Sequence, residues 1–178
     1  MKYLKAAGML LIAALPIAGV IVFRSLIMEL SWQSYVGIFV LSFVSTSGTL
    51  VGGIPLPALA LTFVTGSILN PLPVGIVAGF GSGLGEVFSY PVGTAGRLIA
   101  DRWGLVRFFS AFLTKYGGWA VLLAAAIPNP FFDFVGLASG LAGYPFPKFM
   151  LLVLIGRLIR ALSASYLGAH FAGNMKLP

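Results

Sequence analysis

The stretch AAAIPNPFFDFVGLASG, residues 124 to 140, interrupts an apolar run with two prolines and an asparagine and then places a carboxylate just behind them. Asp133 is the single charged residue between Tyr116 and Pro147. Pro128 and Pro130 cannot lie inside a regular helix, because each lacks an N–H donor and its ring clashes with the preceding turn. The chain therefore bends or turns back here. The composition of the chain indicates whether this happens in water or in a membrane.

The composition is that of a membrane protein. Of the 178 residues, 59% are hydrophobic and 8% are charged, with a mean hydropathy of +1.03, whereas soluble domains carry about 25% charged residues. So short a chain could not bury this much apolar surface in a soluble core, and a single membrane domain over residues 1–178 is expected. With no cysteine and one histidine, His170, we expect no metal site and no cofactor.

The net charge of +7 does not indicate nucleic acid as a partner. The basic residues are few and flank apolar segments, a distribution that membrane topology explains better. We therefore expect no nucleic-acid binding.

The apolar segments divide the domain into an N-terminal spanning helix and two similar halves. The uncharged run 6–23 is long enough to span, and no small-residue cleavage site follows it, so it predicts a retained spanning helix. The other parts are repeat 1 at 31–96, an interfacial linker at 97–116 and repeat 2 at 117–171. Each repeat has two short apolar segments around a break, followed by a full span: 35–48, 58–69 and 74–96, then 117–127, 131–143 and 148–171. The break at 48–57 is not expected to continue a regular helix.

The two halves also align residue by residue. Ile54-Pro55-x-Pro57 matches Ile127-Pro128-x-Pro130 at an offset of 73, and Gly66, Pro71 and Pro73 match Gly140, Pro145 and Pro147 at an offset of 74. Short segments that Pro or Gly interrupts at corresponding places of two halves are typical of transporter binding sites. Kinked spanning helices are the other interpretation of the same prolines.

The basic residues favour hairpins that enter the membrane and return to the same side. With a cytoplasmic N-terminus and two re-entrant hairpins, the cytoplasmic basic residues are Lys2, Lys5, Arg97, Arg102, Arg107, Lys115 and Lys148. Arg24 and Lys176 lie outside, which agrees with the positive-inside tendency. The expected fold is an all-α integral membrane protein, an inverted repeat of a re-entrant helical hairpin plus a spanning helix, with an extra N-terminal spanning helix.

Four ionisable side chains lie deep in the membrane in this arrangement: Glu86, Asp133, Arg157 and Arg160. Each costs about 3 kcal/mol on insertion scales, so such residues usually face the protein interior and serve a function. At 1.5 Å per residue, Glu86 and Arg157 differ in depth by about 7 Å, which two long side chains can bridge. Arg157 is therefore the expected partner of Glu86.

Asp133 has two interpretations that the sequence leaves open. Asn129 can cap exposed N–H groups at the tip, and Asp133 lies in the first turn of the returning half-helix, where the helix dipole favours an anion. Asp133 either acts as a cap alone or also pairs with an arginine beside a water-filled cavity.

Two further patterns lie in the first span. Glu86, Tyr90 and Arg97 recur at helical spacing on one face, so a polar line continues towards the cytoplasm. Gly75, Gly79 and Gly83 form a GxxxG ladder, which predicts close packing against another helix.

These motifs resemble a known family. GSGLGEVFSYPVGTAGR, residues 81 to 97, resembles the glycine–acid–tyrosine motif of the DedA/VTT-domain superfamily, which includes the SNARE-associated Golgi proteins. IPNPFFDFVGLASG followed by FPKFMLLVLIGRLIRALS looks closest to the vacuole membrane protein branch. The resemblance implies opposed re-entrant hairpins and lipid movement across the bilayer: scrambling, or flipping of undecaprenyl phosphate or phospholipid. DedA proteins proper usually carry an arginine after the second hairpin's proline, where this chain has PNPFFD, so proton coupling is not carried over.

The expected function is translocation or scrambling of phosphate-headgroup lipids, with a membrane organiser or assembly factor as the alternative. An enzyme is not expected, because intramembrane aspartyl proteolysis needs two aspartates and no Ser–His elbow is present. The expected translocation path contains Glu86, Tyr90, Arg97, Asn129, Pro130, Asp133, Arg157 and Arg160. The expected structural residues of the hairpin tips are Pro55, Pro57, Pro128 and Gly136.

The expected partners are membrane phospholipids or polyprenyl phosphates, in a multi-pass protein of the cell membrane. The sequence leaves open whether the protein forms a homo-oligomer.

Overall fold

The structure, a computed structural model, describes residues 35–52, 58–99, 104–127 and 134–174. The predicted spanning helix 6–23 lies outside these residues. So do three residues predicted at the hairpin tips, Pro55, Pro57 and Pro128, and three residues predicted on the translocation path, Asn129, Pro130 and Asp133.

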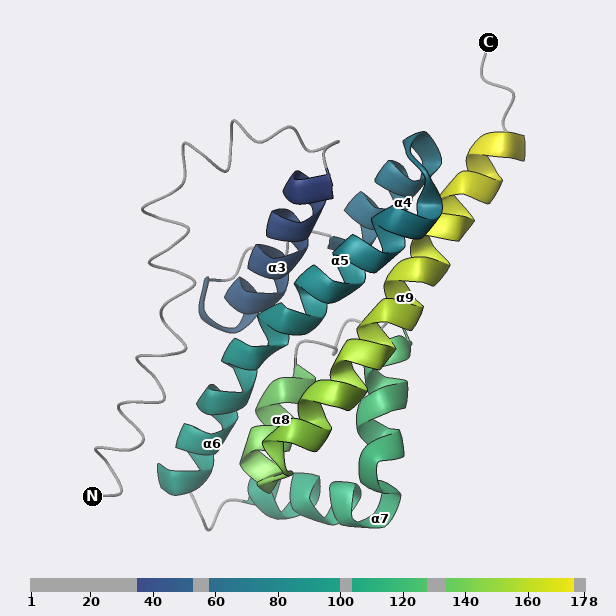
Figure 1. Cartoon of the computed structure of the whole chain (residues 1–178). Helices are drawn as coiled ribbons and strands as arrows, with labels where there is room; N and C mark the ends of the chain where they lie inside the picture. The colour runs from purple at the N-terminus through teal and green to yellow at the C-terminus, as the bar shows by residue number, and fades with distance from the viewer. Residues whose placement is uncertain (1–34, 53–57, 100–103, 128–133, 175–178) are drawn as a thin grey trace.

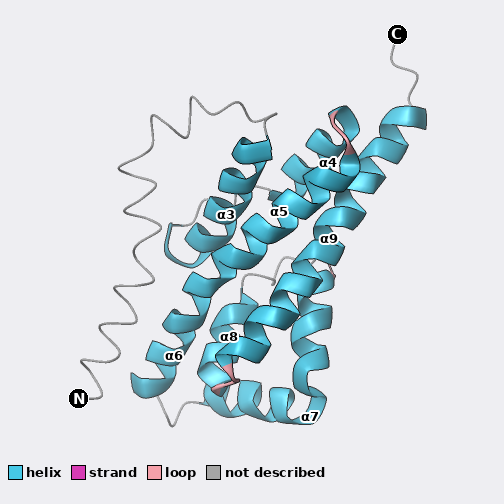
Figure 2. Cartoon of the chain, in the orientation of Figure 1, coloured by secondary structure: helices cyan, strands magenta, loops and turns pink. Residues whose placement is uncertain are grey.

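Every regular element in the described ranges is a helix, which confirms the all-α prediction for this part of the chain (Figure 2). The helices are α3 (Tyr35–Gly52), α4 (Ala58–Ile68), α5 (Pro71–Gly85), the 3-10 helix η1 (Glu86–Phe88), α6 (Ser89–Ile99), α7 (Gly104–Ala126), α8 (Phe134–Ala142) and α9 (Phe146–Asn174).

Two helical stretches are long and apolar enough to cross a membrane, Pro71–Arg97 and Phe146–Gly173. They contain the two predicted spans. The first stretch consists of α5, η1 and α6 in succession, so its helix tightens at Glu86, a local change that the apolar pattern did not predict. Asn70 begins it, because its side chain accepts a hydrogen bond from the N–H of Leu72 at 3.2 Å.

The two long stretches pack on each other and run in opposite directions (Figure 1). Their contact is built on the GxxxG ladder: a Cβ added at Gly75 or at Gly79 would lie 2.8 Å from a backbone Cα of α9. A side chain at either position would push the two backbones apart, so hydrogen is the only substituent that fits. The prediction of close packing at the ladder is confirmed.

The shorter helices lie beside this crossed pair, α3 and α4 towards one end and α7 and α8 towards the other (Figure 1). α3 packs on α5 and α7 packs on α9, whereas α4 packs on α9 and α8 packs on α6. Glycines again allow the contact, because a Cβ at Gly66 would lie 2.5 Å from the Ser165 carbonyl oxygen, and one at Gly140 would overlap the Tyr90 carbonyl oxygen.

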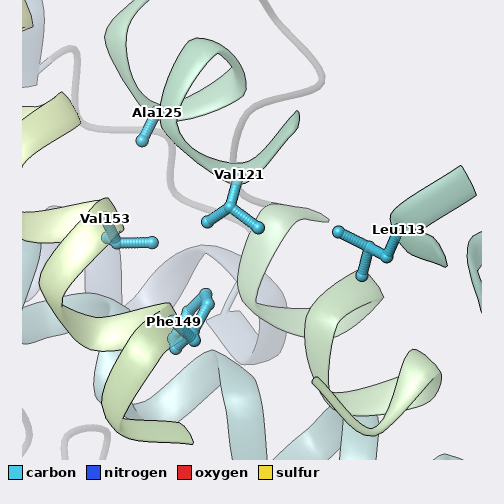
Figure 3. Packing of buried hydrophobic residues seen from close by; sticks show 5 residues of the cluster. All are labelled: Leu113, Val121, Ala125, Phe149 and Val153. Carbon is cyan, nitrogen blue, oxygen red and sulfur yellow. The ribbon is translucent and has the colours of Figure 1, made fainter. Parts of the chain in front are cut away.

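Two small apolar clusters fill the interior between these helices. One joins α7 to α9 through Leu113, Val121, Ala125, Phe149 and Val153 (Figure 3). The other joins α3, α5 and α9 through Ile38, Val74, Ala78 and Ala161. Large apolar side chains also cover the outside, with Trp119 71% exposed and Leu151 60% exposed. An exterior of this kind suits lipid as the surrounding solvent.

Two boundaries differ from the predicted ones. α3 continues to Gly52, past the residue at which the first break was predicted to begin, because Thr49 to Val51 carry no helix-breaking proline. Arg97 lies in the last turn of α6 and not in a separate linker. The boundary predicted between the linker and repeat 2 coincides with a bend inside α7 at Gly117, whose φ of 58° and ψ of −145° suit glycine and few other residues.

Candidate functional site

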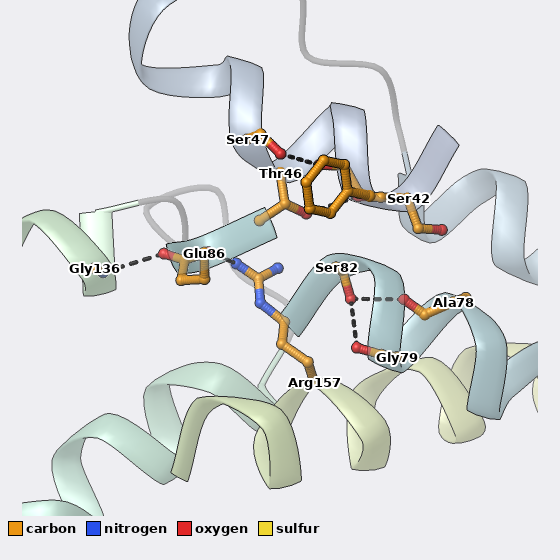
Figure 4. A network of polar contacts seen from close by, with 10 residues as sticks. Ser42, Thr46, Ser47, Ala78, Gly79, Ser82, Glu86, Gly136 and Arg157 are labelled. Atoms are coloured by element: carbon orange, nitrogen blue, oxygen red, sulfur yellow. Dashed lines mark hydrogen bonds and ion pairs between the residues drawn. The ribbon is translucent and has the colours of Figure 1, made fainter. Parts of the chain in front are cut away.

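Glu86 and Arg157 form a buried ion pair at the centre of the crossed helices. Arg157 Nη2 lies 2.7 Å from Glu86 Oε2, and the Gly136 N–H donates a hydrogen bond to Glu86 Oε1 at 3.1 Å (Figure 4). Glu86 is 1% exposed and Arg157 is 5% exposed. The predicted contact between these two side chains is confirmed, and η1, α8 and α9 meet at one carboxylate.

The position of Gly136 explains how the carboxylate reaches α8. Gly136 lies in the first turn of α8, where N–H groups point out of the helix and the dipole favours an anion. A Cβ at Gly136 would lie 3.0 Å from Glu86 Oε1 and 2.6 Å from Ser89 Cβ, so glycine permits the approach. Gly136 was predicted at a hairpin tip, but it lies inside a helix, and its backbone serves the site directly.

A small polar cavity lies on the other side of Arg157. Its volume is about 30 Å³, and it lies between α3, α4, α5 and α9. Its lining residues are Ser42, Leu59, Thr62, Ala78, Ser82, Arg157, Arg160 and Ala161. The Ser42 hydroxyl is buried there and makes no hydrogen bond within the described part of the chain. The sequence predicted both arginines, but it did not predict the three hydroxyl residues.

An apolar groove of about 570 Å³ lies next to this cavity and shares Leu59 and Arg160 with it. The other residues that line the groove come from α4, α7 and α9: Ala60, Phe63, Val64, Ala126, Ser163, Ala164 and Leu167. Arg160 therefore stands between a polar and an apolar space, which is the arrangement that an amphiphile requires.

Tyr90 and Arg97 contact the turn between α8 and α9. The Tyr90 hydroxyl donates a hydrogen bond to the Tyr144 carbonyl oxygen, and its ring packs on Phe146 and Phe149 at centroid distances of 5.1 and 5.2 Å. The Arg97 guanidinium lies against Gly143, where a Cβ would overlap it. Neither residue lines the polar cavity or the groove, so their place in a lipid path stays a prediction.

Asn129, Pro130 and Asp133 are predicted path residues outside the described ranges, and their roles also stay predictions. Within the described ranges, no group of three or more His, Cys, Asp or Glu side chains could hold a metal ion.

The fold and the site define a class: a helical membrane protein whose long apolar helices cross around a buried ion pair. The family model for the VTT domain matches residues 56–170, well over half of the chain. The protein therefore belongs to the VTT-domain family, in the superfamily of DedA and SNARE-associated Golgi proteins. No curated protein and no solved structure matches the chain.

Proposed function

We propose that this protein moves lipids with a phosphate headgroup from one leaflet of the membrane to the other, and that it is not an enzyme. The observation that supports this function best is the position of Arg160, which lines both a polar cavity and a large apolar groove. A translocator needs a polar place for the headgroup inside the bilayer and an apolar surface for the chains.

The chemistry of the cavity fits phosphate. The guanidinium group stays charged at all physiological pH values, and its planar fork binds two phosphate oxygens at once. Glu86 compensates the charge of Arg157 through the 2.7 Å ion pair, so this arginine can stay in the membrane when no lipid is bound.

We further propose that the chain is an inverted repeat of two re-entrant hairpins, α3 with α4 and α7 with α8, each followed by a span. Matched contacts support it. Gly66 packs on Ser165, and Gly140 packs on Tyr90. The residue 74 positions after Gly66 is Gly140, and the residue 75 positions before Ser165 is Tyr90, so the two contacts correspond.

Two further pairs of contacts obey the same rule. Gly168 packs on Phe63 as Gly93 packs on Leu137, and Gly79 packs on Leu158 as Gly83 packs on Leu154. An approximate two-fold axis through the crossing of α5 and α9 accounts for all of these contacts.

The location and the branch belong to the same proposal. We place the protein in the cell membrane with a cytoplasmic N-terminus, on the basis of its basic residues, and in the vacuole membrane protein branch, on the basis of IPNPFFDFVGLASG.

A membrane organiser or assembly factor is the alternative, because in such a protein the Glu86–Arg157 pair would serve stability alone. Lipid transfer by the purified protein separates the two. Vesicles of phosphatidylcholine and phosphatidylglycerol would carry a trace of fluorescent phospholipid, or of a fluorescent neutral glycolipid, that a membrane-impermeant reductant bleaches in the outer leaflet.

We expect that the protein exposes the inner-leaflet phospholipid to the reductant and moves the neutral lipid more slowly. Arg160→Gln should slow phospholipid transfer about tenfold, which corresponds to one lost hydrogen-bonded charge contact. Lys148→Gln, which removes an exposed charge at the start of α9, is the matched control and should transfer normally. Vesicles with wild-type protein that bleach no further than empty vesicles would favour the organiser. A run with a proton gradient tests energy coupling.

A further inference from the structure

The two halves of the proposed repeat differ at the ion-pair site, whose residues have no equivalent of the same type in the other half. In the alignment of the two halves, Glu86 corresponds to Ala161 and Arg157 corresponds to Ser82, both at an offset of 75 residues. Gly136 corresponds to Thr62 at an offset of 74 residues. Glu86, Arg157 and Gly136 make up the ion-pair site, and Ala161, Ser82 and Thr62 all line the polar cavity. The cavity therefore lies where a second carboxylate would lie if the repeat were perfect.

The groups around this cavity favour an acceptor of hydrogen bonds. Arg157 and Arg160 bring two guanidinium groups, whose nitrogens are all donors, and no carboxylate is among the described lining residues. The Ser42 hydroxyl is a further donor, buried without a hydrogen bond in the described part of the chain. Buried polar groups are normally satisfied, so a ligand or a solvent molecule is expected to complete this site.

The small volume of the polar cavity limits the size of the group that can bind in it. A space of about 30 Å³ is roughly twice what one water molecule needs, so two oxygens of one anionic group fit. Arg157 pairs with Glu86 (Figure 4) and also lines this space.

We propose that the cavity is an oxyanion site. Ala161 stands where a perfect repeat would have a glutamate, and a phosphate group binds in the place of that missing carboxylate. For the choice of phosphate over other oxyanions this inference rests on the proposed function, whereas the site itself rests on the cavity and its donors. The bound phosphate and Glu86 then share Arg157, so the protein's own carboxylate competes with the ligand and limits how tightly the ligand is held.

The adjoining groove indicates where the rest of the ligand lies. Leu59 and Arg160 line both spaces, and the groove's residues are almost all apolar. A phosphate held by Arg160 can therefore extend an acyl or prenyl chain between α4 and α9. A free inorganic phosphate has the same headgroup chemistry and lacks this contact.

The experiment compares three probes on the protein purified in a neutral detergent: lysophosphatidate, a monoacylglycerol of the same chain length, and inorganic phosphate. Binding is titrated for the wild type, Ala161→Glu, Ser42→Ala and Gly173→Glu. Ala161→Glu places a carboxylate of the protein itself at the cavity, where it would compete with a bound phosphate. Gly173→Glu adds the same charge near the end of α9, where a Cβ meets no atom within 4 Å, and serves as the control.

We expect lysophosphatidate to bind more tightly than the monoacylglycerol. Ala161→Glu should weaken lysophosphatidate binding at least tenfold, Ser42→Ala should weaken it severalfold up to about tenfold, and Gly173→Glu should leave it unchanged. If inorganic phosphate binds the wild type and loses its affinity in Ala161→Glu, free phosphate is also a ligand of the site. If it does not bind, the lipid form is the ligand.

Unchanged lysophosphatidate affinity in both Ala161→Glu and Ser42→Ala would overturn the oxyanion site and leave a water-filled cavity. Should Ala161→Glu fail to fold, Ser42→Ala decides alone, because it removes a single oxygen. Binding that follows these predictions without any lipid transfer in vesicles would reject the proposed function and keep the site. Transfer with unchanged affinity in the two variants would reject the site and keep the function.

Discussion

Glu86 connects three segments of the chain that are far apart in sequence. One carboxylate oxygen faces Arg157 on α9, and the other accepts the N–H of Gly136 on α8. A fully buried carboxylate is costly unless it is paired and hydrogen-bonded, and here both oxygens have such a contact. In the described part of the chain Glu86 is the sole acidic residue, so the stability of this region depends strongly on it.

Replacement of Glu86 by Gln should therefore destabilise the protein by about 3 kcal/mol or more, because Arg157 keeps its charge and loses its counterion. The double variant Glu86→Gln with Arg157→Gln should recover part of this loss, because neither position then carries a charge without its partner. Unfolding in detergent, measured for both single variants and the double variant, gives the coupling energy. Losses that simply add would mean that the two side chains do not stabilise each other.

Sequence alone was sufficient to find this pair, and it was insufficient to find the cavity beside it. The pair follows from helix rise and membrane depth, which need no knowledge of how helices are rotated. Ser42, Thr62 and Ser82 lie in apolar helices, where a hydroxyl commonly bonds to the carbonyl four residues earlier, as Ser82 does to Ala78 at 2.8 Å. Which hydroxyls face a shared space depends on how α3, α4 and α5 pack.

Among the helix contacts, the close approach of α5 and α9 is one that the sequence predicted. The ladder of small residues identified it, because glycines four residues apart lie on one face of a helix. The 3-10 turn at Glu86 was not predicted, whereas the bend at Gly117 lies at the boundary predicted between the linker 97–116 and repeat 2.

Gly79→Ala should destabilise the crossing by about 1–3 kcal/mol, because its Cβ would lie 2.8 Å from Leu158 Cα and a backbone cannot move aside cheaply. Gly173→Ala is the control: it is helical and open, so it should be neutral or stabilising by up to about 1 kcal/mol. Melting temperatures of the two variants in the same detergent test this. Equal temperatures would mean that α5 and α9 pack less closely than described.

The bend of α7 gives a second prediction for the helices. Gly117→Ala should cost about 1–3 kcal/mol although no atom lies within 4 Å of the added Cβ, because the φ of 58° with a ψ of −145° is strained for any other residue. Denaturant titration of Gly117→Ala against Gly173→Ala measures it. A wild-type midpoint would show that α7 can straighten at no cost.

For the whole molecule, the correspondence of contacts across the crossing is the basis of the proposed inverted repeat. The sequence offsets of 73 and 74 predicted two similar halves, and the packing of α4 on α9 and of α8 on α6 supplies contacts that a single chain of kinked spans would have no reason to match.

The direct test is the side of the membrane on which the hairpin ends lie. Because the chain has no cysteine, single cysteines can be introduced at exposed positions near the two ends of the first proposed hairpin, Val36 and Ile68, and near the two ends of the second, Tyr116 and Lys148. Labelling of intact cells with an impermeant thiol reagent should modify Val36→Cys and Ile68→Cys, whereas Tyr116→Cys and Lys148→Cys should react only after the membrane is opened. Opposite sides for the two ends of either hairpin would contradict the account, because that hairpin would then cross the membrane.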